Sequence, residues 1–532
     1  MRRVTSSIIV VALLSGCGGG GSSGDGSTPP PPPVTAGLAQ TSCGAYQGTD
    51  RGGSWAFLGV RYAAAPIGAR RWKSPEAPTC PTTTVVASSF APVCPQLDRS
   101  TGAPEGDEDC LALNVFAPKS VFPAGRAPVM VFIHGGGNVI GSAREEVEPG
   151  RVLYDGAALA EATGNVVVTV QYRLGPLGWL VHPGLDAEAP DARSGNYGLE
   201  DLVASLAWVR ANAGAFGGNR DRVLIFGESA GGVNVCTLIA SPRAAGLFHA
   251  ALIQSGGCVA DARQKALATG IELAANAGCS TAADPVACLR SKSPAELLAA
   301  LPPVVSVSGG QAPYQPSVDG TLLPSVPLDV IRAGQHNRTA VAIGANAQET
   351  GQEVPLTFNE AQYQLFLSAT FPDPTVRTAV ANLYSSANFG SARLAYVALT
   401  SDVKFICPSR TIARALVASQ SEPVYRYFFT EVPDAPISQQ YGSFHGLELL
   451  YLFGKLDVRG YVPTAAERAL STTVQQYWGT LARDGVPLAT GAPAWGRYDP
   501  GRDNHLLLNA GGVAMADGVI TQRCDFWQAL GF

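Results

Sequence analysis

Residues 223–232 read VLIFGESAGG, and this stretch decides the fold class. Its first four residues are apolar and predict a buried strand, and the residues after it predict a helix. Between the two lies a Gly-x-Ser-x-Gly turn centred on Ser229. Glycine suits positions 227 and 231 because side chains there would collide with the neighbouring strand and helix. A strand, a sharp turn and a helix in this order expose the serine hydroxyl at the end of a sheet. Ser229 is therefore a candidate nucleophile.

The pentapeptide alone is weak support, because residues 20–24, GGSSG, match the same pattern inside a stretch rich in Gly and Ser. A chance turn is the alternative for any single match of this kind. The apolar strand before Ser229 and the helical stretch after it distinguish the two sites, and they favour Ser229.

Composition limits the classes of function. The chain has 532 residues, of which 46% are hydrophobic and 15% are charged, so it can bury a large core. Its net charge of −5, with no basic cluster, argues against nucleic acid as a partner. With six His, no zinc-type Cys and His spacing and no phosphate-binding glycine loop, neither a metal nor a cofactor is implied. Eleven Cys indicate disulfides if the chain is exported.

The first sixteen residues have the pattern of an export signal. Arg2 and Arg3 precede an apolar run at 8–14 that is too short to span a bilayer. The LSGC that ends at Cys17 resembles a bacterial lipobox, in which the Cys becomes the lipidated first residue. We expect residues 1–16 to be removed and the product to be lipid-anchored in the bacterial cell envelope. The alternative is ordinary signal cleavage and a soluble periplasmic or secreted protein.

Residues 17–36 predict a tether, rich in Gly and Ser at first and then in Pro. No second linker interrupts residues 37–532, which we interpret as one domain. The lipid anchor is the only membrane contact expected. The sequence carries no signal for the oligomeric state.

Apolar strand candidates recur along this domain, with helical stretches between them. One such helix is predicted at 199–211, with Leu202, Leu206 and Val209 on one face. Strands that alternate with helices predict a mostly parallel sheet covered on both sides. The predicted strands are residues 129–134, 166–172, 223–226, 251–254, 340–344 and 424–429.

A serine that transfers acyl groups also needs donors for the oxyanion. The predicted strand at 129–134 ends in His and is followed by three glycines. Because glycine leaves backbone N–H groups unobstructed, we predict an oxyanion hole made by the N–H groups of Gly136, Gly137 and Ala230. A lone triple glycine is usually a turn, but His-Gly-Gly-Gly upstream of a nucleophile turn is more specific.

The serine also needs a base and an orienting acid. His445 lies beyond the last predicted strand, where the chain order Ser, acid, His places the base. The acid should follow a strand between these two residues, and Glu349 follows the strand at 340–344. Position alone leaves Asp319 and Asp402 as alternatives.

These stretches resemble the type-B carboxylesterase/lipase family, which includes the cholinesterases. The resemblance runs from near Cys43 to Phe532 and implies the α/β-hydrolase fold, a large, mostly parallel central sheet with helices on both faces. The blocks that carry it are EDCLALNV at 108–115, QYRLGPLG at 171–178, FGGN at 216–219 and FGESAGG at 226–232.

Two further blocks bear on the triad. Residues 344–349, GANAQE, resemble the block with the triad acid, which implies Glu349. Gln348 and Thr350 depart from the Asp and Gly that are common there. Residues 442–454 resemble the histidine block and support the choice of His445 as the base.

Three other residues take their interpretation from the resemblance. Glu228, beside the nucleophile, and Ser255, in QSG, match positions that support the site near the triad histidine. Asn138 stands where the family usually has an aromatic residue, so the acyl pocket should differ from those of relatives.

The resemblance also implies disulfides. The family's pairs would be Cys94–Cys110, Cys279–Cys288 and Cys407–Cys524, and we add Cys43–Cys80 as a fourth. With Cys17 lipidated, Cys236 and Cys258 remain. Cys236 is expected to be a buried thiol.

The implied activity is hydrolysis of carboxylic esters through an acyl-enzyme, with His445 as base and Glu349 orienting it. Residues 95–109, inside the first Cys loop, are short, charged and without an aromatic residue. Such a loop disfavours a choline ester, which needs an aromatic face, and favours soluble short- to medium-chain or aryl esters. A lipase acting on long-chain acylglycerols is the alternative. A non-catalytic adhesion protein of the same fold is disfavoured because Ser229, His445 and the glycine triplet are all present.

Overall fold

The computed structural model describes residues 36–302 and 313–531. The predicted signal segment, Cys17 and all but the last residue of the predicted tether lie outside these residues. Internal contacts divide the chain into Met1–Ala36 and Gly37–Phe532, and the second unit carries the fold. Within the described ranges, no helix is both long enough and apolar enough to cross a membrane.

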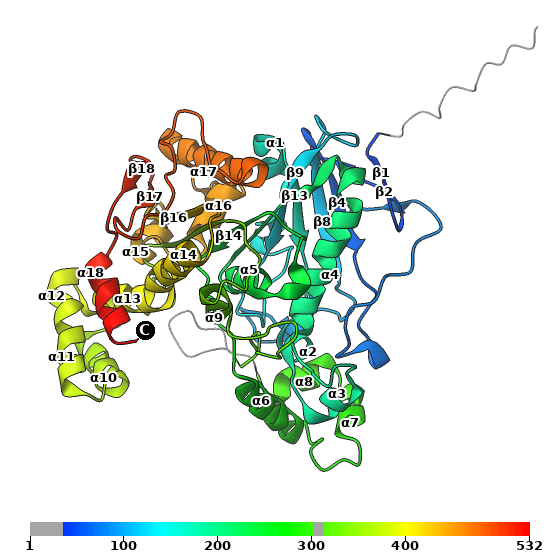
Figure 1. Cartoon of the computed structure of the whole chain (residues 1–532), viewed down its shortest axis with the longest axis horizontal. Helices are drawn as coiled ribbons and strands as arrows, with labels where there is room; N and C mark the ends of the chain where they lie inside the picture. Colours follow the sequence, from blue (N-terminus) through cyan, green and yellow to red (C-terminus); the bar gives the residue numbers. More distant parts are fainter. Residues whose placement is uncertain (1–35, 303–312, 532) are drawn as a thin grey trace, which may run out of the picture. The chain divides into compact units, whose positions relative to one another are not determined.

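An eleven-stranded sheet runs through the described part of the second unit (Figure 1). The strands from β17 to β12 run parallel, and antiparallel strands extend both edges. In spatial order they are β18 (Ala514–Ala516), β17 (His505–Leu508), β16 (Val424–Phe429), β15 (Ala340–Asn346), β14 (Ala250–Gln254), β13 (Gly218–Glu228), β9 (Ala127–Ile133), β12 (Val166–Val170), β8 (Ala112–Pro118), β4 (Ser54–Arg61) and β3 (Thr49–Asp50).

Short strands form three further small sheets. The hairpin of β6 and β7 lies inside the loop between Cys94 and Cys110. The strands are β1 (Leu38–Thr41), β2 (Gly44–Gln47) and β5 (Val85–Val86) in one sheet, β6 (Gln96–Leu97) and β7 (Pro104–Glu105) in another, and β10 (Glu146–Glu148) and β11 (Arg151–Val152) in the third.

Helices cover both faces of the large sheet (Figure 1). The α-helices are α1 (Ala157–Thr163), α2 (Gly175–Trp179), α3 (Pro183–Glu188), α4 (Tyr197–Asn212), α5 (Ala230–Ala240), α6 (Arg263–Asn276), α7 (Pro285–Ser291), α8 (Pro294–Ala300), α9 (Pro327–Arg332), α10 (Glu360–Thr370), α11 (Pro374–Leu383), α12 (Ser386–Phe389), α13 (Ala392–Ser401), α14 (Cys407–Ser419), α15 (Pro436–Tyr441), α16 (Leu447–Leu452), α17 (Ala465–Asp484) and α18 (Thr521–Ala529).

The two faces of the sheet belong to two hydrophobic cores. Successive side chains of β9 point to opposite faces, so Val131 joins the core under α4, α5 and α14 while Phe132 joins the core under α1, α16 and α17. Leu238 of α5 and Trp478 of α17 are fully buried in these two cores. Burial on both faces explains why the central strands are near-continuous apolar runs.

The predicted strands are all present, and the α/β fold class is confirmed. The strand before Ser229 is longer than predicted, since β13 begins at Gly218. The predicted helix at 199–211 is α4, and the helix after Ser229 is α5.

Five neighbouring parallel strands, β9, β13, β14, β15 and β16, end at the same edge of the sheet. In open α/β sheets ligands bind at this edge, beyond the carboxyl ends of the strands. The loops that follow these strands carry the predicted glycine triplet, Ser229, Ser255, Glu349 and His445.

The four predicted disulfides, Cys43–Cys80, Cys94–Cys110, Cys279–Cys288 and Cys407–Cys524, are present. The expectation of a buried Cys236 thiol was wrong. Cys236 lies on α5 and Cys258 follows β14, and because α5 packs on β14 their Cα atoms are 5.3 Å apart. This separation suits a disulfide, and the two residues form a fifth bridge.

Candidate active site

Ser229 occupies a strained backbone position between β13 and α5. Its φ is 59° and its ψ is −124°, which a residue with a side chain seldom adopts. The Ser229 N–H donates a hydrogen bond of 2.9 Å to the carbonyl of Gln254, at the end of β14. Strain of this kind persists only where the surroundings enforce it, and it gathers at functional sites.

Two glycines make this turn possible. A Cβ at Gly227 would lie 2.6 Å from the carbonyl carbon of Gly231 and 2.7 Å from the Ile133 oxygen. A Cβ at Gly231 would also collide with the Ile133 oxygen. The tight approach of β13, α5 and the end of β9 therefore requires glycine at both positions, as the sequence predicted.

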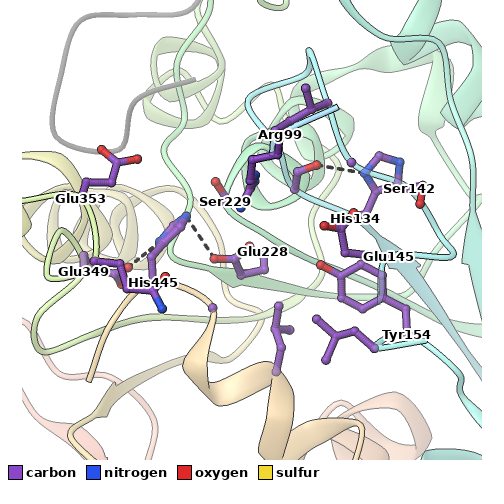
Figure 2. Close-up of a pocket in the computed structure, with 18 residues that line it drawn as sticks. Arg99, His134, Ser142, Glu145, Tyr154, Glu228, Ser229, Glu349, Glu353 and His445 are labelled. Atoms are coloured by element: carbon purple, nitrogen blue, oxygen red, sulfur yellow. Dashed lines mark hydrogen bonds and ion pairs between the residues drawn. The ribbon is translucent and has the colours of Figure 1, made fainter. Parts of the chain in front are cut away.

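A cavity of about 500 Å³ lies at Ser229 (Figure 2). Its volume is typical of a site for a small molecule. The residues that line it are Arg99, His134, Gly135, Gly136, Ile140, Gly141, Ser142, Glu145, Leu153, Tyr154, Glu228, Ser229, Glu349, Gln352, Glu353, His445, Gly446 and Leu449.

His445 is held by Glu349, as Figure 2 shows. Nδ1 of His445 lies 2.6 Å from Oε2 of Glu349, and the His445 N–H donates a hydrogen bond of 3.1 Å to the Glu349 carbonyl. The other carboxylate oxygen, Oε1, accepts from the Ser255 hydroxyl and from the Asn346 N–H, each at 2.6 Å. Glu349 is buried and both of its oxygens are bonded, so it can orient the imidazole.

The other ring nitrogen of His445 faces a second carboxylate. Nε2 lies 3.1 Å from Oε1 of Glu228, the residue before Ser229. Within the described residues, the Ser229 hydroxyl makes no hydrogen bond to His445 under ordinary distance limits. Such bonds often form only once substrate is bound. The imidazole is therefore flanked by carboxylates on both sides.

The burial of His445 and Glu228 and the contact between them shift the pKa of both side chains. Burial opposes the charge on His445, but Glu228 and Glu349 outweigh it and raise the pKa of His445 to about 9. Burial raises the pKa of Glu228 to about 7, although His445 acts in the opposite direction. The two side chains therefore titrate as a coupled pair.

A third buried carboxylate, Glu448, lies near His445 and Glu228. Oε1 of Glu448 accepts from the Gln254 amide at 3.0 Å, and Oε2 accepts from the Asn346 amide at 2.6 Å. Burial raises the pKa of Glu448 to about 8, and the charges of Glu228 and Glu349 add to the effect. Glu448 was not predicted from the sequence. Its place three residues after His445, inside the histidine block, was the available signal.

The two alternative acids lie elsewhere. Asp319 accepts from the Asn196 amide at 2.7 Å, and Asp402 accepts from the Tyr384 hydroxyl at 2.7 Å and pairs with Arg523 at 3.0 Å. Neither residue lines the cavity. Of the three acids left open by position, the structure brings Glu349 to His445.

The glycine triplet follows β9 at the edge of the cavity. Gly136 and Gly137 have φ of 103° and 65°, which favours glycine. A Cβ at Gly135 would lie 3.0 Å from the Ser229 Cβ, so the loop runs directly beside the serine. Within the described residues, the N–H groups of Gly136, Gly137 and Ala230 have no backbone partner. They are available as donors.

Asn138, which follows the glycine triplet, is engaged with α5. Its side chain is fully buried and does not line the cavity. Oδ1 of Asn138 accepts from the Asn234 amide of α5 at 2.8 Å. The Asn138 side chain therefore points towards α5 and not into the cavity.

Comparison with known proteins gives consistent relatives. The sequence model of the Carboxylesterase family matches residues 36–527. The chain is 33% identical to liver carboxylesterase of Sus scrofa over 518 residues, covering 89% of this chain and 88% of that protein. It is 32% identical to para-nitrobenzyl esterase of Bacillus subtilis (90% and 96% covered). It is 33% identical to fumonisin B1 esterase of Sphingopyxis macrogoltabida (90% and 87% covered). A solved structure of PNB esterase superposes with a TM-score of 0.79 at 32% identity, covering 92% of this chain and all of that one.

Proposed function

This chain belongs to the carboxylesterase family and is a carboxylic ester hydrolase, and we propose that it works through an acyl-enzyme formed on Ser229. The observation that carries the proposal is the strained Ser229 in the same cavity as the Glu349–His445 pair. A serine, a base and an oriented acid in one cavity are the parts that nucleophilic ester cleavage needs.

The reaction begins when Nε2 of His445 exchanges its contact with Glu228 for the Ser229 hydroxyl. His445 takes the hydroxyl proton while Ser229 Oγ attacks the ester carbonyl. The N–H groups of Gly136, Gly137 and Ala230 stabilise the resulting oxyanion. His445 then gives the proton to the leaving alcohol.

Deacylation repeats these steps with water. His445 removes a proton from water, the hydroxide attacks the acyl carbonyl, and Ser229 leaves with the proton as the acid is released. Glu349 holds Nδ1 throughout and stabilises the imidazolium form.

The experiment that tests this mechanism combines a variant with a covalent label. Ser229→Ala should abolish hydrolysis and leave the unfolding transition nearly unchanged, because the hydroxyl lies at a cavity and supports no core packing. An organophosphonate should label Ser229 in the wild type. Labelling of another serine, or full activity in the variant, would overturn the assignment.

For the substrate we propose soluble short- to medium-chain or aryl esters, with para-nitrobenzyl and p-nitrophenyl esters as the first panel. Arg99, Glu145 and Glu353 line the cavity, so a long apolar chain would have to desolvate charged groups. The β6–β7 hairpin lacks the size of an apolar lid, and Glu108 behind it pairs with Arg71. A rate maximum at long chains with a jump at substrate saturation would instead support a lipase.

For the location we propose a lipid anchor at Cys17 that holds the enzyme on the bacterial cell envelope. The proposal rests on the lipobox-like LSGC at 14–17 and on the tether after it. Cys17→Ser should move the protein from the membrane fraction to the soluble fraction, since two or more acyl chains are needed for stable attachment. A wild-type protein that is soluble after export would contradict it.

A further inference from the structure

We infer that the buried amide pair Asn138–Asn234 fixes the spacing between the two halves of the oxyanion site. The inference rests on the proposed function, because it concerns the donors that serve Ser229. One half of the site is the glycine loop after β9, and the other is the first residue of α5. These halves come from distant parts of the chain, so contacts between the glycine loop and α5 must fix the distance between the donors.

The two asparagines stand next to the proposed donors. Asn138 directly follows Gly137, and Asn234 lies four residues after Ala230, one turn along α5. Nδ2 of Asn234 donates to Oδ1 of Asn138 at 2.8 Å, across 96 residues of sequence. Both side chains have an exposed fraction of 0%. Among the described residues, this is the hydrogen bond that joins residues 134–138 to α5.

The far side of the loop is fixed by the residues after β12. The Gly175 N–H donates to the Asn138 carbonyl at 2.8 Å, and the Tyr172 hydroxyl donates to the His134 carbonyl at 2.9 Å. The rings of Tyr172 and His134 stack with centroids 4.5 Å apart. The loop is thus fixed to the residues after β12 by several contacts. On the other side, the close backbone contact of Gly231 with Ile133 and His134 sets how near α5 lies, and the amide pair adds a directional bond beyond the glycines.

A contribution to folding stability does not explain why this amide pair is present. Nδ2 of Asn138 and Oδ1 of Asn234 are buried and make no hydrogen bond to any described residue. Half-satisfied amides in a core are unfavourable, and such groups in native proteins call for a reason. Asn138 also adopts a φ of 61°, a left-handed conformation that Asn tolerates better than most residues. A short amide at 138 therefore supplies both the loop's turn and the bond to α5.

The spacing matters because oxyanion donors must lie about 2.7–3.1 Å from the position that the oxyanion will occupy. A displacement of about 1 Å can lower a rate by roughly 100-fold. Asn138 and Asn234 are positioning residues on this view, since neither lines the cavity. Their loss should weaken transition-state stabilisation while leaving substrate binding in the ground state nearly unchanged.

The test compares Asn234→Ala with a matched control, Asn196→Ala. Asn196 is also buried and also uses its amide to bond a distant segment, Asp319 at 2.7 Å, but that bond joins neither the glycine loop nor α5. Active sites are counted by organophosphonate titration, so that unfolded molecules do not enter kcat. We expect kcat of Asn234→Ala to fall about 10- to 100-fold, with KM changed less than about threefold. Asn196→Ala should lower the unfolding midpoint and keep kcat.

Two further measurements separate positioning from general damage. A trifluoromethyl ketone, which mimics the oxyanion, should bind Asn234→Ala more weakly by the same factor as the loss in kcat. Asn138→Gly keeps the left-handed backbone, and the double variant Asn138→Gly/Asn234→Ala should lose no more kcat than either single variant, because the pair acts as one unit. Asn234→Ser serves as the second variant if Asn234→Ala does not fold.

An unchanged kcat in folded Asn234→Ala or Asn234→Ser would overturn the inference, as would kcat losses that add in the double variant. An equal loss of kcat in Asn196→Ala would also overturn it. These outcomes are distinct from failure of the proposed function. If the organophosphonate labels Ser229 while the asparagine variants keep kcat, the acyl-enzyme mechanism stands and only the positioning role is lost.

Discussion

The charged side chains around His445 can be compared with those around Asp503, near the C-terminus. Both groups are buried. Asp503 is paired with Arg426 at 2.8 Å and with Arg410 at 3.0 Å, and it also accepts from the hydroxyls of Tyr498 and Thr521. Around His445 the carboxylates are in excess, because Glu228, Glu349 and Glu448 surround a single imidazole.

The acidity of the carboxyls follows from this balance. Burial would raise the pKa of Asp503, but Arg426, the two hydroxyls and Arg410 together lower it. Burial raises the pKa of Glu228 and of Glu448 to about 7 and 8, and His445 offsets only part of the effect for Glu228. The buried carboxylate of the Asp503 cluster is paired with cations, as in a structural cluster, whereas the His445 cluster holds titratable groups near neutral pH. Groups of the second kind mark sites of proton transfer.

The largest expected contrast comes from removing one carboxylate in the His445 cluster. Glu349→Gln should lower kcat about 10⁴-fold, because the amide cannot stabilise the imidazolium and favours the wrong tautomer. The unfolding free energy should change little by comparison. Steady-state kinetics and urea unfolding on the same samples measure both. Asp319→Asn, which removes another acid left open by position, should keep kcat, and an equal loss in both variants would contradict the role of Glu349.

The opposite pattern is expected in the Asp503 cluster. Asp503→Asn leaves Arg426 buried without its ion pair, while Arg410 keeps only Asp525, so the free energy of unfolding should fall by about 3–5 kcal/mol. The kcat per titrated active site should stay within about twofold of wild type. The exposed pair of Arg502 and Asp517 offers a matched control, because Asp517→Asn should cost less than about 1 kcal/mol. A large loss of kcat in folded Asp503→Asn would contradict a purely structural role for this cluster.

The third prediction concerns the pH profile. The charge of Glu228 raises the pKa of His445, so the base is free only as pH rises. In the wild type, kcat/KM should therefore increase through neutral pH towards alkaline pH. Glu228→Gln removes that charge and should move this rise to lower pH by about one unit. Stopped assays at constant ionic strength, with Asp503→Asn as the variant whose profile should not move, measure the shift.

Much of the fold was readable from local pattern. The central strands are buried on both faces, so their apolar runs identify them without knowledge of the sheet. The turn at Ser229 was predictable because its glycines are required by steric contact with Ile133 and α5. The order of Ser229, Glu349 and His445 along the chain follows from the order of the strands that carry them.

The remaining features depend on tertiary contacts that no local pattern encodes. Cys236 and Cys258 were not paired because their bridge arises from the packing of α5 on β14. The contact of Glu228 with His445 depends on two loops meeting beyond β13 and β16. The bond between Asn138 and Asn234 could not be predicted, because the left-handed backbone of Asn138 turns its side chain towards α5.

The smallest expected effect is on the change of stability with pH, which should have opposite signs for the two clusters. A carboxyl whose pKa is raised in the folded state binds its proton more tightly when folded. Its contribution is therefore present at low pH and is lost as pH rises through the folded pKa, about 7 for Glu228 and about 8 for Glu448. The raised pKa of His445 acts in the same direction up to about 9. The lowered pKa of Asp503 acts in the opposite direction, since its contribution is lost as pH falls.

Glu448→Gln isolates one of these groups. Each proton that the folded state holds and the unfolded state has lost costs about 1.4 kcal/mol of stability per pH unit, so the wild type should lose stability between pH 7 and pH 9. The variant has no proton to lose at this position, and its loss over the same range should be smaller by about 1 kcal/mol. Urea unfolding at pH 7, 8 and 9 measures both slopes. Because the comparison uses the change with pH, a constant destabilisation from the new amide does not enter it. Parallel slopes in the two proteins would mean that Glu448 keeps its charge when buried, and the contrast with the Asp503 cluster would then rest on Glu228 and His445 alone.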